Sequence, residues 1–383
     1  MAMQRFVGRG RGRTGVARGL PAWLASAAAG ILGGGCVPLG TPPTDRTRLP
    51  FNVDGPLTAV VASGDPVFRT EPVFDSIPGK LGSHAPTITA FPGGELLAAW
   101  YSYSGPGELD GSAIYTAGWR PDAGGWEPPQ LHIDRPEGDG NPVLHSAGDD
   151  AWLFQAVVPG GWSTAHIEVQ RSADRGRTWS APRVIAGPLG SNVRFPPVRL
   201  RDGTLLLPAY DDLLQRSLFF ASADGENWTL RSVIATAGPH RSIQPSVAVL
   251  EGGRLLSVMR NTGGGWLWVT ESDDDGRGWT EPADSGFPNP ASPAALLRLT
   301  SGDLVLVYNN SNALRRPLSI AISGDDGATW HPPRVLVDGD GAYAYPSAVQ
   351  TPDGLIHVVY SHDRERIVHV VFNEAWAGAE DAQ

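Results

Sequence analysis

The sequence has one cysteine, fewer basic than acidic side chains and no metal-ligand spacing among its histidines, and each shortage excludes a class of protein. Because Cys36 stands alone, no disulfide can form within the chain. The formal net charge of −10 argues against a nucleic-acid-binding surface, which is normally basic. No two histidines show a spacing such as His-x-x-x-His, so we predict neither a metal site nor another cofactor.

Glycine and proline are abundant instead, with 48 and 34 residues, and 41% of the chain is hydrophobic. This apolar content can fill a large core, so the chain is globular and not disordered. Turn-forming residues about every dozen positions favour an all-β fold.

The N-terminal 36 residues are predicted to be an export signal. Several arginines precede an apolar run from Leu20 to Leu32, which is followed by small residues, as in a signal peptide. The run is shorter than the roughly 20 residues that a membrane-spanning helix needs. Cys36 after three glycines is similar to a bacterial lipoprotein cleavage site, although the leucine lies four residues before it and not three. Cys36 is therefore either a lipid-anchor site or an incidental cysteine.

Residues 37–67 contain several prolines and are expected to form a linker to the folded domain. We accordingly expect an exported protein, which is periplasmic, on the cell surface or secreted. It would meet a membrane only through the N-terminal signal or a lipid anchor.

A tryptophan-containing motif recurs along most of the chain. The pattern S-x-D-x-G-x-x-W, which we call the box, is complete at Trp179, Trp279 and Trp330. A shortened copy ends at Trp228, and a degenerate copy, the worn box, ends at Trp126. Successive tryptophans are separated by 53, 49, 51 and 51 residues, obtained as 179 − 126, 228 − 179, 279 − 228 and 330 − 279. A repeat of this length, with glycine turns between short strands, is typical of a propeller blade.

Six first strands are predicted, and they lie near residues 85–90, 142–146, 196–200, 245–250, 292–299 and 346–351. The last repeat ends at 367–372 without a fourth strand, and residues 71–77 are expected to supply that strand and close the ring. We therefore predict an all-β, six-bladed propeller over residues 68–376, with a tail over 377–383. A five- or seven-bladed ring is the alternative.

The repeated aspartates are predicted to be structural, because a residue set that returns in every blade builds the blade. They are Asp174, Asp224, Asp274 and Asp325. Their carboxylates would accept hydrogen bonds from turn N–H groups, and the tryptophans would pack between blades. The ligand or active site is expected on the opposite face of the ring, which we call the mouth. First strands begin and second strands end there, so unlike polar residues meet at the axis.

The boxes, their period and these polar residues together resemble the sialidase superfamily, in particular bacterial BNR-repeat glycoside hydrolases. The resemblance implies an exo-glycosidase that releases a terminal acidic sugar from a glycan. It also implies a role for each matching residue: Arg260 and Arg315 bind the substrate carboxylate, Tyr345 is the nucleophile, and Asp110 is the acid/base with Glu108 as substitute. From their places at strand ends on the same face, Glu108, Arg194 and Asn309 are predicted as further substrate contacts.

Two positions depart from the family pattern. Sialidases have an arginine where this chain has His84, and an activating glutamate where it has Gln244. A glutamine cannot take the proton of a tyrosine, and losing an arginine weakens the carboxylate clamp. His84 is a candidate base because the ordinary pKa of histidine is near neutrality, while Arg194 either replaces the missing arginine or only flanks the mouth. The expected sugar is therefore sialic acid or a related acidic sugar.

Two other functions fit the same face, and both also have a glycan as partner. One is a polysaccharide lyase acting on uronic acids, with His84 as base and Tyr345 as acid. The other is a non-catalytic carbohydrate-binding propeller, in which Arg260 and Arg315 only join blades and Tyr345 packs at the rim.

Overall fold

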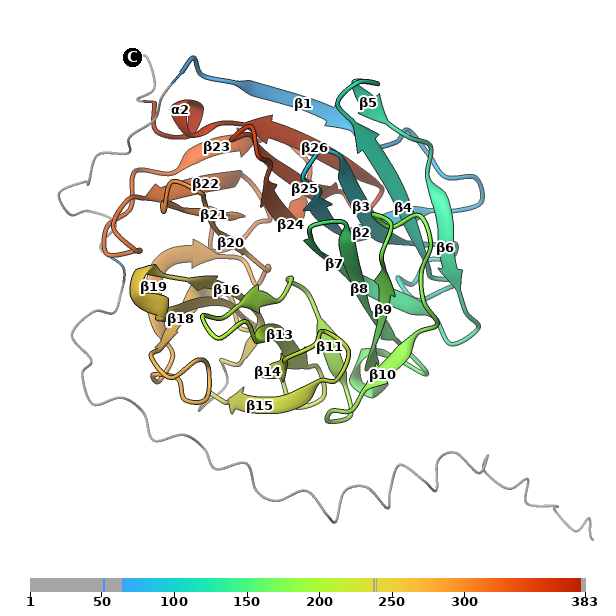
Figure 1. Cartoon of the computed structure of the whole chain (residues 1–383), viewed down its shortest axis with the longest axis horizontal. Helices are drawn as coiled ribbons and strands as arrows, with labels where there is room; N and C mark the ends of the chain where they lie inside the picture. Colours follow the sequence, from blue (N-terminus) through green and yellow to red (C-terminus); the bar gives the residue numbers. More distant parts are fainter. Residues whose placement is uncertain (1–50, 52–63, 237, 239, 380–383) are drawn as a thin grey trace, which may run out of the picture. The chain divides into compact units, whose positions relative to one another are not determined.

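The computed structural model describes residues 51, 64–236, 238 and 240–379 (Figure 1). Within these ranges nearly all regular structure is β, and six sheets are arranged around an axis as propeller blades. The prediction of a six-bladed, all-β propeller is confirmed. The expected signal peptide with Cys36, and most of the expected linker, lie outside the described residues. None of the helices in the described part is long and apolar enough to cross a bilayer.

We letter the blades A to F in chain order and give their strands from the axis outward. Blade A contains β2 (Gly82–Ala90), β3 (Leu96–Tyr103), β4 (Ala113–Arg120) and a divided outer strand, β5 (Gly125–Trp126) and β6 (Gln130–Asp134). Blade B contains β7 (Asp139–Ala147), β8 (Asp150–Val157), β9 (His166–Ser172) and β10 (Arg183–Ile185). Blade C has a divided inner strand, β11 (Ser191–Val193) and β12 (Val198–Arg199), followed by β13 (Leu205–Asp211), β14 (Arg216–Ser222) and β15 (Thr229–Ile234).

The remaining blades follow the same antiparallel plan. Blade D contains β16 (Ser242–Val249), β17 (Leu255–Asn261), β18 (Gly265–Ser272) and β19 (Ala283–Asn289). Blade E contains β20 (Ala295–Arg298), β21 (Leu304–Asn309), β22 (Leu318–Ser323) and β23 (Arg334–Val337). Blade F contains β24 (Tyr343–Gln350), β25 (Ile356–His362), β26 (Arg366–Phe372) and β1 (Phe68–Pro72), and the short helix α2 (Glu374–Ala377) follows β26.

The ring is closed by a strand from the N-terminal side, as expected. Strand β1 pairs antiparallel with β26 from Phe68 opposite Phe372 to Pro72 opposite Val368, and the two lie side by side in Figure 1. The strand begins three residues before the predicted segment. A carboxylate oxygen of Glu71 lies 3.0 Å from Nδ1 of His369, which adds a side-chain contact to the ladder.

Each complete box is a turn held by its own serine and aspartate. In blade E the Ser323 hydroxyl accepts the Gly327 N–H at 3.0 Å and donates to Asp325 at 2.9 Å. The Asp325 carboxylate accepts the Thr329 N–H at 2.8 Å. Gly327 has φ +86°, a conformation that side chains disfavour, which explains the glycine at this place in the motif.

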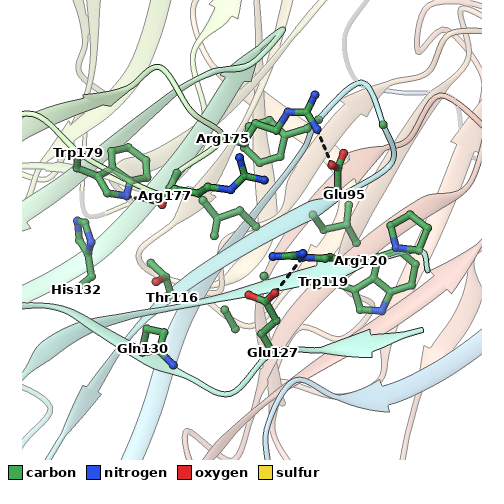
Figure 2. Close-up of a pocket in the computed structure, with 18 of the residues that line it drawn as sticks. Glu95, Thr116, Trp119, Arg120, Glu127, Gln130, His132, Arg175, Arg177 and Trp179 are labelled. Atoms are coloured by element: carbon green, nitrogen blue, oxygen red, sulfur yellow. Dashed lines mark hydrogen bonds and ion pairs between the residues drawn. The ribbon is translucent and has the colours of Figure 1, made fainter. Parts of the chain in front are cut away.

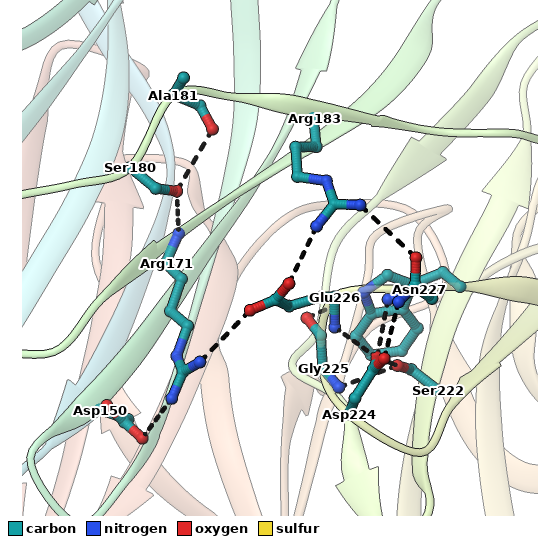
Figure 3. Close-up of polar contacts among 11 residues, drawn as sticks. Asp150, Arg171, Ser180, Ala181, Arg183, Ser222, Asp224, Gly225, Glu226 and Asn227 are labelled. Atoms are coloured by element: carbon teal, nitrogen blue, oxygen red, sulfur yellow. Dashed lines mark hydrogen bonds and ion pairs between the residues drawn. The ribbon is translucent and has the colours of Figure 1, made fainter.

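The box tryptophans pack against the preceding blade. Ring centroids lie 5.3 Å apart for Trp228 and Phe154, 4.4 Å for Trp279 and Phe219, and 5.4 Å for Trp330 and Phe287. Salt bridges add to this contact between blades B and C, where Arg171 and Arg183 both bind Glu226 (Figure 3).

One residue of the expected linker belongs to the core of the propeller. Phe51 is buried, and its ring centroid lies 5.4 Å from that of Trp330 and 5.8 Å from that of Phe287. The apolar packing of the domain therefore includes a residue that precedes the predicted boundary at residue 68.

Candidate active site

The inner strands of four blades carry a bulge at the end that forms the mouth. Their registers shift between His84 and Thr87, Gly140 and Val143, Ile243 and Ser246, and Ala344 and Ser347. A residue before proline has positive φ in each bulge: Ala85 (49°), Asn141 (43°), Gln244 (54°) and Tyr345 (58°). Positive φ is uncommon outside glycine, and bulges redirect side chains, so the backbone itself sets the orientation of these residues.

Tyr345 lies among the predicted polar residues. Nη1 of Arg260 donates to the Tyr345 hydroxyl at 3.2 Å and to Oε1 of Gln244 at 3.2 Å. The guanidinium carbon of Arg315 is 5.4 Å from the centre of the Tyr345 ring. The structure thus brings together four of the predicted site residues.

The pKa of Tyr345 is lowered by these neighbours. Burial alone would raise the pKa of its phenol, but the positive charges of Arg260 and Arg315, together with the Gln244 amide, outweigh burial and lower it. A phenol that ionises more readily is a better nucleophile than a free tyrosine. Two arginines therefore favour the ionised form of Tyr345, an effect that Gln244 cannot provide as a base.

His84 packs against Tyr345, with ring centroids 4.2 Å apart. Nδ1 of His84 lies 2.8 Å from the Ser361 hydroxyl, which also accepts the Ala85 N–H at 3.1 Å. The proton of Ser361 is thus available to Nδ1, and in that tautomer Nε2 is a donor. Nε2 is buried and has no hydrogen-bond partner among the described residues.

The surroundings of His84 oppose its protonation. Burial holds the pKa of His84 well below its ordinary value, and the positive charges of nearby arginines, Arg364 and Arg315 first among them, lower it further. The ring is therefore neutral at physiological pH and a weaker base than the ordinary pKa of histidine suggests.

Arg194 is fully buried beneath the mouth. It donates from Nη1 to Pro86 O at 3.0 Å and from Nη2 to Tyr345 O at 2.6 Å and Pro346 O at 3.0 Å. Burial lowers its pKa to about 10, so it remains charged at neutral pH. These contacts join the bulges of blades A and F through both Nη groups, and among the described residues Nε has no hydrogen-bond partner.

The loop between β3 and β4 carries the two predicted carboxylates, and only one contacts the cluster. Glu108 accepts the Tyr101 hydroxyl at 3.0 Å and forms an ion pair with Arg364. Asp110 is exposed and accepts the Gly107 N–H of its own loop at 2.8 Å. In the described structure Asp110 makes no hydrogen bond to Tyr345 or the arginines.

Asn309 is buried at the boundary of blades E and F. Its side-chain amide donates to Tyr343 O at 2.7 Å and to Pro317 O at 3.3 Å. These are contacts to backbone carbonyls, so the present structure supports a bracing role more directly than a substrate contact.

Two further residues belong to the mouth. Arg364 lies in the turn between β25 and β26, pairs with Glu108 and influences His84 electrostatically. Asp212 follows β13 near Arg260, and burial raises the pKa of its carboxyl. Both positions follow second strands, and for Asp212 this register is a sequence signal, whereas Arg364 stands in a run of charged residues typical of an exposed turn.

Comparisons with known proteins agree with this architecture. Residues 94–358 match the family described as BNR repeat-like domain. A sialidase of Bacteroides fragilis is 26% identical over 275 residues, which cover 61% of this chain and 48% of that protein. A sialidase of Micromonospora viridifaciens is 24% identical over 368 residues, which cover 83% of this chain and 56% of that protein. The chain spans about half the length of these two relatives.

Among solved structures, a Hadza microbial sialidase superposes with a TM-score of 0.67 at 20% identity, over 76% of this chain and 66% of that one. At 20% identity this likeness shows the fold alone. The family match extends over residues 94–358, which is most of the chain, and the chain belongs to the family described as BNR repeat-like domain.

Proposed function

We propose that the protein is an exported exo-glycosidase that releases a terminal acidic sugar, sialic acid or a relative of it, from a glycan. The observation that carries the proposal is the contact of Tyr345 with Arg260 beside Arg315. This arrangement combines a phenol of lowered pKa with cations that can bind a carboxylate. Export, and a lipid anchor at Cys36, are the parts of the proposal that rest on the N-terminal sequence.

Three arginines would hold the carboxylate of the sugar. Arg260 and Arg315 flank Tyr345, and Arg364 would exchange its ion pair with Glu108 for the substrate. Arg364 would then bind the carboxylate in place of the sialidase arginine whose position is occupied by His84 in this chain. Arg194 and Asn309 would support the site from below through backbone carbonyls.

The reaction would proceed by attack of the Tyr345 phenolate oxygen on the anomeric carbon while the glycosidic C–O bond breaks and the leaving oxygen takes a proton from the acid. Water would then attack the anomeric carbon, give its proton back to the same carboxylate and release Tyr345 as phenolate. Asp110 is assigned as the acid, and it must leave Gly107 to reach the leaving oxygen. Glu108, already ion-paired, is assigned to holding Arg364.

A lyase mechanism is less well supported, because it needs His84 as base and the pKa of His84 is held well below its ordinary value by burial and neighbouring arginines. A binding propeller would not require the lowered pKa of Tyr345.

The proposal is tested by incubating the full chain with a fluorogenic sialoside and with a panel of uronide oligosaccharides. We expect hydrolysis of the sialoside, and a loss of roughly 10³-fold or more in Tyr345→Phe. The matched control is Tyr343→Phe, which removes a hydroxyl whose one hydrogen bond within the described residues is to Asp338 O. An unsaturated uronide product would overturn the hydrolase in favour of a lyase. Absence of turnover, with glycan binding that persists in Tyr345→Phe, would leave a binding propeller.

A further inference from the structure

A cavity of about 710 Å³ lies between blades A and B on the box side of the ring (Figure 2). It is lined by the start of β3, the end of β4 and the box turn of blade B. In this antiparallel plan those ends lie on the face opposite the mouth. The cavity is therefore separate from the site around Tyr345, and its volume falls within the roughly 300–1,000 Å³ of typical ligand sites.

The cavity coincides with an irregular blade. The outer strand of blade A is divided into β5 and β6. Trp179 meets the imidazole of His132 on β6 at 5.5 Å, whereas Trp228, Trp279 and Trp330 each meet a phenylalanine. The smaller partner leaves Trp179 only half-buried, whereas Trp228, Trp279 and Trp330 are buried.

The cavity presents polar groups of both signs around this aromatic ring. Arg120 pairs with Glu127 at 3.0 Å, and Arg175 pairs with Glu95 at 2.5 Å, as Figure 2 shows. The guanidinium of Arg177 has no ion pair or hydrogen bond within the described ranges, and it projects beside Trp179. Three arginines and three carboxylates line the cavity, counting Asp122 with the two glutamates. Balanced charge favours a neutral ligand.

One lining side chain carries a polar atom that lacks a partner. Oε2 of Glu95 is buried and has no hydrogen bond to any described residue. Buried polar groups are nearly always hydrogen-bonded, so this unpaired acceptor, together with the unpaired guanidinium of Arg177, points to a ligand with hydroxyl groups.

We propose that this cavity binds a neutral hexopyranose residue of a glycan chain. The apolar C–H face of the sugar ring packs on the half-buried indole of Trp179, and its hydroxyls bond to Arg177 and Glu95. A pyranose combines a flat apolar face with a rim of hydroxyls, which is the combination that the cavity complements. The site does not depend on the activity proposed for the mouth, and it would hold glycan on the opposite face of the ring.

The test measures binding of neutral glycans of glucose, galactose, mannose, N-acetylglucosamine and N-acetylgalactosamine to the full chain, by saturation-transfer NMR and titration calorimetry. The variants are Arg177→Ala and Trp179→Phe. The box of blade D offers matched controls, because Arg277 and Trp279 occupy the same motif positions. Melting temperatures establish that each variant folds.

We expect at least one neutral glycan to bind, with affinity reduced about tenfold or more in Arg177→Ala and unchanged in Arg277→Ala. Trp179→Phe should weaken binding, while Trp279→Phe should not. The proposal is overturned if no neutral glycan binds at ~10 mM, if acidic sugars bind in preference to neutral ones, or if binding is lost in Arg260→Ala and retained in Arg177→Ala.

Discussion

Arg260 donates to the hydroxyl of Tyr345 at 3.2 Å, and this contact joins the second strand of blade D to the first strand of blade F. The same guanidinium nitrogen holds Gln244, whose amide lies within 3.5 Å of the Tyr210 hydroxyl. The candidate nucleophile is therefore one end of a hydrogen-bonded chain that crosses three blades.

Replacing Arg260 by alanine should cost substrate binding through the carboxylate. Losing a charged hydrogen bond is worth about 1.5–3 kcal/mol, so kcat/KM on a sialoside should fall roughly 10–150-fold. A methyl-ester sialoside tests the cause, because it removes the carboxylate charge, and it should lose much less on going from wild type to Arg260→Ala.

Arg254→Ala is the control for this experiment. Arg254 lies at the other end of the same hairpin and meets Glu271 at 3.7 Å. Equal losses of kcat/KM in Arg260→Ala and Arg254→Ala would contradict the assignment of Arg260. So would a loss in Arg260→Ala that is as large on the methyl ester as on the sialoside.

The pH dependence of activity should follow the Tyr345 phenol. Arg260 and Arg315 lower the pKa of Tyr345 against the effect of burial, so the ionised form appears at a lower pH than for a free tyrosine. Removing a nearby positive charge destabilises the phenolate and raises its pKa. In Arg315→Gln the rising limb of the rate profile should therefore move to higher pH.

Tyrosinate absorbance gives an independent readout of the same shift. Burial raises the pKa of other phenols, among them Tyr210 and Tyr308. The tyrosinate absorbance that appears at the lowest pH should belong to Tyr345 and should therefore be missing in Tyr345→Phe. In Arg315→Gln the same absorbance should appear at a higher pH. An unmoved titration would remove the electrostatic explanation.

Leaving-group dependence should identify the acid. A substrate with a good aryl leaving group needs little protonation, whereas a natural glycoside needs a proton donor. Asp110→Asn should therefore lose roughly 10²–10⁴-fold on the natural glycoside and much less on the aryl one.

Glu108→Gln should lose activity on both substrates to a similar degree, because Glu108 orders Arg364 and not the leaving oxygen. If Glu108→Gln shows the leaving-group dependence and Asp110→Asn does not, the acid role passes to Glu108.

Arg194→Met should destabilise the propeller. The change leaves the carbonyls of Pro86, Tyr345 and Pro346 without their donor, at a cost of about 3 kcal/mol or more in the free energy of unfolding. Arg183→Met, which breaks an exposed ion pair with Glu226, should cost about 1 kcal/mol or less. Urea unfolding measures both, and similar effects would show that Arg194 braces nothing.

The period of the box motif was sufficient to predict the fold, because each copy marks the same turn of a blade. Once one blade is placed, antiparallel alternation decides which strand ends share a face, and this led to Tyr345, Arg260 and Arg315. The closing strand followed from a count of strands, since blade F lacks a partner for β26 in its own repeat.

Positions that depend on irregular backbone could not be predicted in the same way. Arg194 looks like a mouth residue from its place at a strand start, but the inner strand of blade C is divided at this point and the side chain turns into the core. Arg364 lies in a run of charged residues typical of an exposed turn, and its pairing with Glu108 depends on a loop in blade A. Neither event leaves a local pattern.

The closing strand also has a consequence for assembly. Strands β1 and β26 lie at opposite ends of the propeller sequence, so β1 has no partner until β26 has been made, and each presents an unpaired edge until the two meet. A β1 segment from one copy offers β26 of a second copy the same five residue pairs that it offers its own. The seam is thus where two chains would exchange strands at high concentration, and the contact of Glu71 with His369 would form equally well in the exchanged pair.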